Sequence, residues 1–336
     1  MKKFIYKYII FIFPLIVLLI CDIFSPIDAF TYRPWEALLF QSNASMVFYP
    51  NQKLKTQSVG DLCHHTKFEI KKNEIWMTDK LGYRNNEFIE NADVLLIGDS
   101  FVVGSSITQD STITNLLQNS LNAPVYNLAP ADFINFIDLL NQGIIKKPKT
   151  VIYSFVERSI PNTLRKSTEK KNTEDVSSIS VFKDKVNRLY SLKYLKSRVS
   201  GKQGKGVPGK LDLRMFFFNG IKQKYHFDRL VEITKTIQSY KEYCDSIGVD
   251  FICLPLPNKE TVYFDKVPFK TQPNYLFKLD SILKENNIKT INTLELFNNY
   301  RLTNTKLIYH LDDTHWNDMG VELVANKLTE YISMNM

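Results

Sequence analysis

Residues 94–101, which read VLLIGDSF, decide how this sequence is interpreted. The first four residues form a short, uninterrupted apolar run, which is typical of a strand buried on both faces. Glycine and two small polar residues follow, and helical periodicity then continues to about Leu121. The stretch therefore predicts a buried strand that ends in a tight turn into a helix.

The same alternation of short strands and helices continues along the chain. Apolar runs rich in β-branched or aromatic residues predict further strands at 125–128, 150–156, 251–254 and 289–292. Helices are predicted at 132–145, 228–246, 274–286 and from about Asp318, with Asn317 as the last N-cap. Such alternation gives a parallel sheet covered on both faces. We expect a three-layer, flavodoxin-like α/β domain of about five parallel strands, whose sites form at the strands' carboxyl ends.

Ser100 lies in the turn after the first of these strands. Gly98 permits a tight turn, and the start of a helix offers free backbone N–H groups that suit a tetrahedral oxyanion. A serine nucleophile also needs a base. Without one, the alternative interpretation is that Ser100 only caps a helix.

A histidine near the other end of the chain supplies a candidate base. His315 precedes the last predicted helix and follows Asp313 and Asp312 by two and three residues. An acid this close can accept the imidazole N–H and leave the other ring nitrogen facing a serine. A single histidine in an acidic loop is usually a surface residue, but its coincidence with the serine turn favours a catalytic set.

Composition narrows the class of protein. The chain has 336 residues, 44% of them hydrophobic, which is ample for a packed core and excludes a wholly disordered chain. Four cysteines without a CxxC pair indicate no disulfide framework, zinc site or redox chemistry, and we expect no metal or cofactor. Cys63, Cys244 and Cys253 allow one disulfide, whose pairing the sequence leaves open.

The amino terminus predicts a membrane anchor. Three lysines within the first seven residues precede and interrupt an apolar run to Cys21, the pattern of a secretory signal or signal anchor. The sequence ending at Ala29 is a poor cleavage site, which favours an uncleaved anchor. We expect a single-pass transmembrane helix at 1–23, an irregular linker and lead-in at 24–75, and an extracytoplasmic (periplasmic) domain at 76–336.

A basic insertion interrupts the α/β pattern at about 160–215. Between Arg165 and Lys210 there are 13 Lys and Arg residues against four Asp and Glu residues. We predict loop and short helix near the site, either a ligand-binding lid or a variable, solvated surface loop. The stretch favours an acidic glycan, but it lacks interleaved stacking aromatics, so no nucleic-acid partner is expected.

Two motifs together resemble a known family. The strand followed by GDSF at 98–101, and DDTHWN at 312–317, are similar to the SGNH (GDSL) hydrolase superfamily. The Asp-x-His-Trp pattern resembles the branch that contains the alginate O-acetyltransferases and related cell-envelope polysaccharide acyltransferases. Further stretches that look like this branch are 81–84, 155–158 and 257–263. The resemblance covers about residues 76–332.

The resemblance implies a Ser-His-Asp triad. Ser100 is the nucleophile, His315 the base and Asp313 the acid, because His-Trp marks the acyltransferase branch. Asp312 is the alternative acid, since other members of the superfamily place the acid three residues before the histidine.

The oxyanion hole departs from the usual pattern of the superfamily. A glycine after the second strand and an asparagine after the third are missing here. The backbone N–H of Ala129 is expected to replace the glycine. Arg158 either supplies charge at the site or holds a substrate carboxylate, or else it forms a structural salt bridge with Glu157.

Three further residues are candidates for the substrate cleft. Lys259 and Tyr263 line the cleft, or else Lys259 is solvated and Tyr263 packs in the core. Trp316 is either a platform on which a sugar stacks or a core residue, and a lone tryptophan is more often core.

The resemblance implies a membrane-anchored O-acetyltransferase that acts on an extracytoplasmic polysaccharide through an acyl-serine intermediate. A separate multi-pass membrane acyltransferase is the expected donor partner. Alternative functions are a glycan or lipid esterase (deacetylase) with the same triad, and a non-catalytic glycan-binding assembly protein.

Overall fold

The central sheet is parallel throughout, as the sequence predicts. Its strand order is β4 (Val125–Asn127), β3 (Val94–Ile97), β5 (Thr150–Val156), β8 (Asp250–Leu256) and β9 (Lys289–Thr290). The structure is a computed structural model that describes residues 2–24, 31–40, 47–164, 177–188, 190–201, 203–210, 212–218 and 225–334. The expected α/β fold is confirmed.

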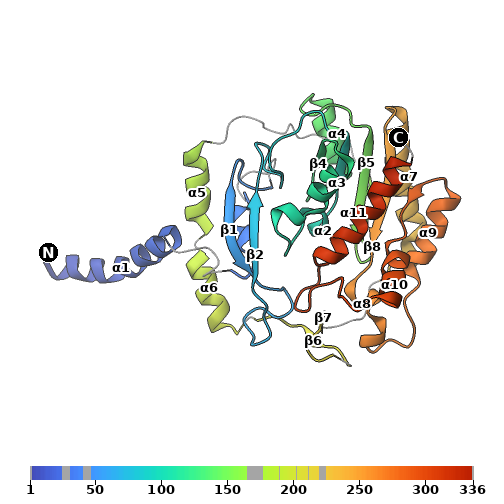
Figure 1. The fold of residues 1–336 in the computed structure, drawn as a ribbon. Helices are drawn as coiled ribbons and strands as arrows, with labels where there is room; N and C mark the ends of the chain where they lie inside the picture. Colours follow the sequence, from blue (N-terminus) through green and yellow to red (C-terminus); the bar gives the residue numbers. More distant parts are fainter. Residues whose placement is uncertain are drawn as a thin grey trace.

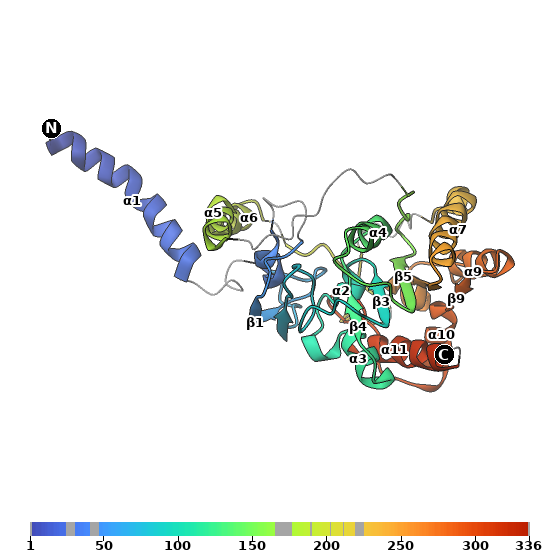
Figure 2. The ribbon, with the colours of Figure 1, turned by 90° about the horizontal axis from the view of Figure 1, so that it is seen from above.

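Helices cover both faces of this sheet (Figures 1 and 2). One face carries α3 (Ile113–Leu121), α10 (Thr293–Thr303) and α11 (Asp318–Ser333), and the other carries α4 (Phe133–Asn141), α7 (Leu230–Ser246) and α9 (Tyr275–Glu285). Every residue of β3 and β5 is buried as a result. The side chain of Asn317 caps α11 as predicted, by accepting the N–H of Gly320.

Short helical turns complete the described chain. They are α2 (Ser100–Val103), α8 (Lys259–Val262), η2 (Pro34–Leu38), η3 (Gln109–Ser111), η4 (Phe227–Arg229) and η5 (Phe264–Lys266).

The lead-in differs from the irregular segment expected at 24–75. Residues Lys53–Ser58 (β1) and Lys72–Met77 (β2) form an antiparallel hairpin. The strand β1 reads KLKTQS and is largely exposed, so it lacks the alternating apolar signal of a half-buried strand. Helix α10 also escaped prediction, because only three of its residues are buried.

The lead-in is fastened to the loop that precedes α11. Asp312 accepts the backbone N–H groups of Gly60 (2.8 Å) and Ile70 (2.9 Å), and it pairs with Lys72 (2.9 Å). The backbone O of Asp312 also accepts the N–H of Leu62. The segment between β1 and β2 is therefore part of the packing of the α/β domain.

The helices of the basic insertion lie elsewhere than expected. Its described part forms α5 (Ser178–Arg188), α6 (Tyr190–Val199) and a small hairpin of β6 (Val207–Pro208) with β7 (Phe216–Phe217). Helices α5 and α6 lie beside β1 and the end of α1 (Lys2–Phe24), away from the carboxyl edge of the central sheet (Figures 1 and 2). For these helices, the expectation of a position near the site is wrong. Residues 165–176 of the insertion lie outside the described residues.

One helix among the described residues is long and apolar enough to cross a membrane. Helix α1 (Lys2–Phe24) contains the span 3–22, whose mean hydropathy is 2.5 and which the protein does not bury. All four cysteines are free, so the disulfide that the sequence allowed is absent from the structure.

We predict that Gly60→Ala detaches the lead-in from the loop that precedes α11. A Cβ at Gly60 would lie 2.0 Å from the backbone O of Asp312, which neither backbone can accommodate. The thermal unfolding midpoint in detergent should fall by more than for Gly143→Ala. At Gly143 a Cβ meets nothing within 4 Å, and only the positive φ costs about 1 kcal/mol. Equal midpoints for the two variants would contradict the prediction.

Candidate active site

The turn after β3 presents the Ser100 hydroxyl at the carboxyl edge of the sheet. Asp99 is the N-cap of α2, and its carboxylate accepts the N–H of Phe101 (2.9 Å). A Cβ at Gly98 would lie 2.5 Å from a methyl carbon of Val102, so this tight turn requires glycine. Because Asp99 does the capping, the Ser100 hydroxyl is left for another partner. The interpretation of Ser100 as only an N-cap is therefore wrong.

That partner is His315. Ser100 Oγ lies 2.8 Å from His315 Nε2, and His315 Nδ1 lies 2.6 Å from Asp313 Oδ1. Both His315 and Asp313 are buried, whereas Ser100 is half-buried. The structure thus joins the three predicted residues in one hydrogen-bonded chain from serine to carboxylate.

Asp313 is held as an ionised acceptor. Besides the imidazole, it accepts the N–H groups of His315 (2.9 Å) and Asp61 (3.1 Å) and the hydroxyl of Ser106 (2.9 Å). Burial alone would raise the pKa of Asp313, but the charge of and hydrogen bond from His315 hold it well below its usual range. Asp312, the alternative acid, makes no contact with the imidazole among the described residues, and its partners lie in the lead-in.

Asp61 is a site residue that the sequence did not reveal. Its carboxylate accepts both the N–H (2.9 Å) and the hydroxyl (2.7 Å) of Thr314, and it pairs with Arg33 (3.1 Å). Burial and the neighbouring Asp313 raise its pKa. Ligand atoms of Asp61, Asp313 and His315 lie within 4.8 Å of one another, but hydrogen bonds already occupy His315 Nδ1 and both oxygens of Asp313. The cluster fits a triad better than a metal site.

Lys259 lines no cleft and is not solvated. It is fully buried, and its ammonium donates to the backbone oxygens of Phe216 (2.6 Å), His310 (2.5 Å), Leu311 (3.1 Å) and Asp313 (3.0 Å). Burial lowers its pKa to about 8. Lys259 therefore holds the loop that carries the acid and the base, and both sequence interpretations of it are wrong.

Tyr263 and Trp316 are core residues. The Tyr263 hydroxyl accepts the N–H of Ile308 (3.0 Å), and Trp316 is fully buried with its ring 5.5 Å from that of Phe101. In both cases the packing interpretation is the correct one, and neither side chain is placed to contact a sugar.

The expected oxyanion donor is already engaged. The N–H of Ala129 donates to the side-chain oxygen of Asn127 (2.8 Å), so Ala129 does not replace the missing glycine. Among the described residues, the backbone N–H of Ser100 donates no hydrogen bond. This N–H is therefore a donor that is free to meet an oxyanion.

Arg158 lies at the edge of the site without the salt bridge that one interpretation assigned to it. It is exposed, donates to the side-chain oxygen of Asn258 (2.5 Å), and lies 5.8 Å from the centre of the Phe101 ring. No salt bridge joins it to Glu157 in the described part of the chain. Its charge remains available to a substrate.

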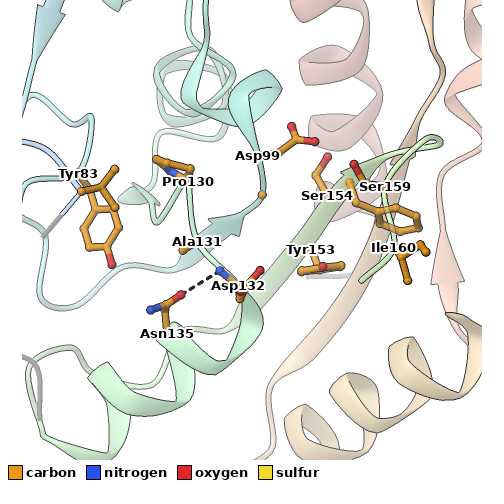
Figure 3. Close-up of a pocket in the computed structure, with 13 residues that line it drawn as sticks. Tyr83, Asp99, Pro130, Ala131, Asp132, Asn135, Tyr153, Ser154, Ser159 and Ile160 are labelled. Atoms are coloured by element: carbon orange, nitrogen blue, oxygen red, sulfur yellow. Dashed lines mark hydrogen bonds between the residues drawn. The ribbon is translucent and has the colours of Figure 1, made fainter. Parts of the chain in front are cut away.

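A cavity of about 480 Å³ opens beside this turn (Figure 3). Gly98 and Asp99, the two residues before Ser100, line one side, and Asp132 and Asn135 at the start of α4 line another. Ser154, which is 2% exposed, also lines it, and its hydroxyl has no hydrogen-bond partner among the described residues. Two carboxylates and no lysine, arginine or histidine face this space within the described chain.

Residues 215–335 match the protein-family model described as an SGNH hydrolase-like domain of the acetyltransferase AlgX. This stretch contains Asp313 and His315 but not Ser100. The resemblance to the alginate O-acetyltransferase-like branch is confirmed there, and with the fold it supports an acyl-handling enzyme of the SGNH type. No curated protein matches the chain by sequence.

Several solved structures are also similar to this chain. A member of the lipolytic protein G-D-S-L family from Veillonella parvula has 11% identity and a TM-score of 0.37, over 71% of this chain and 97% of that one. The lipase/acylhydrolase from Enterococcus faecalis has 12% identity and a TM-score of 0.38, over 72% of this chain and 95% of that one. A catalytic mutant of an acetylxylan esterase from Geobacillus stearothermophilus has 15% identity and a TM-score of 0.36, over 73% of this chain and 95% of that one. Since these TM-scores are below 0.5, the functional argument comes from the site itself.

We predict that Asp313→Asn lowers activity, whereas Asp312→Asn lowers stability. Without the Asp313 carboxylate, the imidazole loses its orienting partner, and kcat for p-nitrophenyl acetate should fall by roughly 10³–10⁴-fold. Asp312→Asn should instead lower the unfolding midpoint, because Lys72 loses its buried partner, while kcat falls far less. A larger loss of kcat for Asp312→Asn would refute the assignment.

We predict that a buried carboxyl beside Arg158 makes stability depend on pH. Burial raises the pKa of Glu157 to about 8, despite hydrogen bonds from Thr261 and Asn258 that lower it. In the folded state Glu157 keeps its proton up to about pH 8, whereas in the unfolded state it releases the proton near pH 4.5. The free energy of unfolding therefore falls as the pH rises from about 4.5 to about 8.

Glu157→Gln keeps the shape of the protonated carboxyl. It should therefore raise the unfolding midpoint at pH 8 relative to the unaltered protein, by about 2–4 °C per kcal/mol regained, and change it little at pH 5. The exposed Glu285→Gln is the control, and it should change neither value. If the unfolding midpoint of Glu157→Gln lies below that of the unaltered protein by the same amount at pH 5 and pH 8, Glu157 is ionised in the folded state.

Proposed function

We propose that this chain is a membrane-anchored O-acyltransferase that O-acetylates an extracytoplasmic polysaccharide. The observation that carries the proposal is the hydrogen-bonded series from Ser100 through His315 to Asp313. The match of residues 215–335 to an acetyltransferase family model supports acyl transfer as the reaction class.

The proposed reaction has two halves. Ser100 Oγ attacks the carbonyl carbon of the acyl donor while His315 Nε2 takes the hydroxyl proton, and the Ser100 N–H stabilises the oxyanion. The leaving group departs with the proton from His315, which leaves an acyl-serine. A sugar hydroxyl then gives its proton to His315 and attacks the acyl carbon, and Ser100 recovers its proton as the ester leaves. Asp313 keeps the imidazole oriented in both halves.

The cavity beside Ser100 supports an acceptor sugar without a carboxylate. Asp99 and Asp132 accept hydrogen bonds from hydroxyl groups but repel a uronate, and Arg158, whose charge is available at the edge of the site, is not among the residues that line the cavity. This differs from the acidic glycan that the basic insertion suggested, and the described helices of that insertion do not line the cavity.

Topology and partner belong to the same proposal. The lysines before the apolar run favour a cytoplasmic amino terminus, with the catalytic domain outside. Activated acyl donors are cytoplasmic, so the acyl group must cross the membrane, and a multi-pass membrane acyltransferase is the proposed donor. Tethering through α1 raises the concentration of Ser100 near that donor without any new contact.

We predict that a fluorophosphonate probe labels the full-length protein in detergent, and that Ser100→Ala abolishes labelling. The same substitution should lower p-nitrophenyl acetate turnover by at least ~10³-fold, because the nucleophile is lost. Ser111→Ala, on the η3 turn, is the matched control and should leave both signals unchanged. No labelling of the unaltered protein would favour a non-catalytic glycan-binding role.

NMR of the envelope polysaccharide from cells that lack the protein separates transfer from hydrolysis. Loss of O-acetyl signals, restored by the unaltered gene but not by Ser100→Ala, is the expected result. A gain of O-acetyl signals would instead identify an esterase that uses the same triad.

A further inference from the structure

Helices α5 and α6 expose apolar side chains that follow helical spacing. On α6, Leu192, Leu195 and Val199 lie three and four residues apart and are all exposed, Val199 to 89%. On α5, Ile179 and Phe182 repeat the pattern and are 66% and 57% exposed. An exposed apolar stripe on an amphipathic helix indicates a surface that another apolar phase covers.

The opposite sides of these helices are already occupied by the protein. Asp184 of α5 is buried and accepts the hydroxyl of Tyr49 (2.5 Å). On α6, the hydroxyl of Tyr190 donates to the backbone O of Glu36 (2.7 Å). The apolar stripe is therefore the face directed away from the catalytic domain.

The contact between α6 and the end of α1 places the apolar stripe relative to the membrane. Ser191 donates through its N–H (2.6 Å) and its hydroxyl (3.0 Å) to the carboxylate of Asp22, in the last turn of α1. Figures 1 and 2 show α5 and α6 beside this end of α1 and running across its direction. A helix that crosses a bilayer runs roughly along the membrane normal. Because α5 and α6 lie at one end of α1 and run across its axis, they are parallel to the membrane surface.

Lysines accompany the apolar residues. Lys183, Lys193 and Lys196 are exposed and lie next to them in sequence. Apolar side chains with flanking lysines are the composition of helices that lie in the lipid headgroup layer, where the ammonium groups meet lipid phosphates.

We propose that the α5–α6 pair docks on the surface of the membrane that α1 enters, with Leu192, Leu195 and Val199 among the acyl chains and the lysines on anionic headgroups. This second contact holds the catalytic domain in one orientation on the bilayer. The proposal depends on α1 as a membrane span and is independent of the reaction at Ser100.

The test uses the full chain reconstituted in vesicles of phosphatidylcholine and phosphatidylglycerol. Leu195→Cys is labelled with the environment-sensitive fluorophore NBD, and lipids that carry doxyl groups serve as quenchers. Leu302→Cys on α10 is the matched control, since Leu302 is an exposed leucine remote from α1. The native cysteines other than Cys21 are buried, and labelled protein without either substitution corrects for them.

The label at position 195 should be blue-shifted and quenched several-fold more strongly than the label at 302. Equal quenching at the two positions would overturn the docking. Adding Lys193→Gln and Lys196→Gln should weaken quenching at 195 in the anionic vesicles. Unchanged quenching would overturn the role of the lysines. Fluorophosphonate labelling of Ser100 in the same vesicles reports the catalytic site separately.

Discussion

The rest of the site depends on the buried ammonium of Lys259. Four backbone oxygens, one from β7 and three from the loop before α11, converge on its three N–H groups. Removing a partner from a buried charge costs about 3–5 kcal/mol. The position of the Lys259 ammonium therefore fixes the position of the loop before α11. Because α8 follows β8 directly, Lys259 ties the acid and base of the triad to the central sheet rather than to the surface.

The sheet could be predicted because its signal is local and strong. Strands such as 150–156 are buried on both faces and rich in β-branched and aromatic residues, and their observed bounds agree closely with the predicted ones. The hairpin at 53–77 escaped prediction because its first strand is polar and largely exposed, so the pairing of its two strands depends on tertiary contacts. Helix α10 escaped for the same reason, since few of its residues face the core.

The triad residues could be proposed from two short motifs, but their support could not. Lys259 acts on backbone carbonyls, which carry no side-chain signature in the sequence, and Asp61 reaches Thr314 from a segment 253 residues away. The assignment of Ala129 failed for a related reason. The replacement of a main-chain donor was reasonable in principle, but the side chain of Asn127, two residues earlier, occupies that N–H. Only coordinates show which backbone groups are already engaged.

The contact between Arg33 and Asp61 has a consequence for how far the enzyme reaches. Asp61 holds Thr314, next to His315, and Arg33 lies near the start of the described chain that follows α1. Six residues, 25–30, separate α1 from the next described residue, and a chain of that length spans at most about 25 Å. With α1 in a bilayer, the active serine thus works within a thin layer above the lipid. Under the proposed function, the polymer would be modified as it passes through that layer, at or soon after its emergence, and not once it has moved out into the envelope.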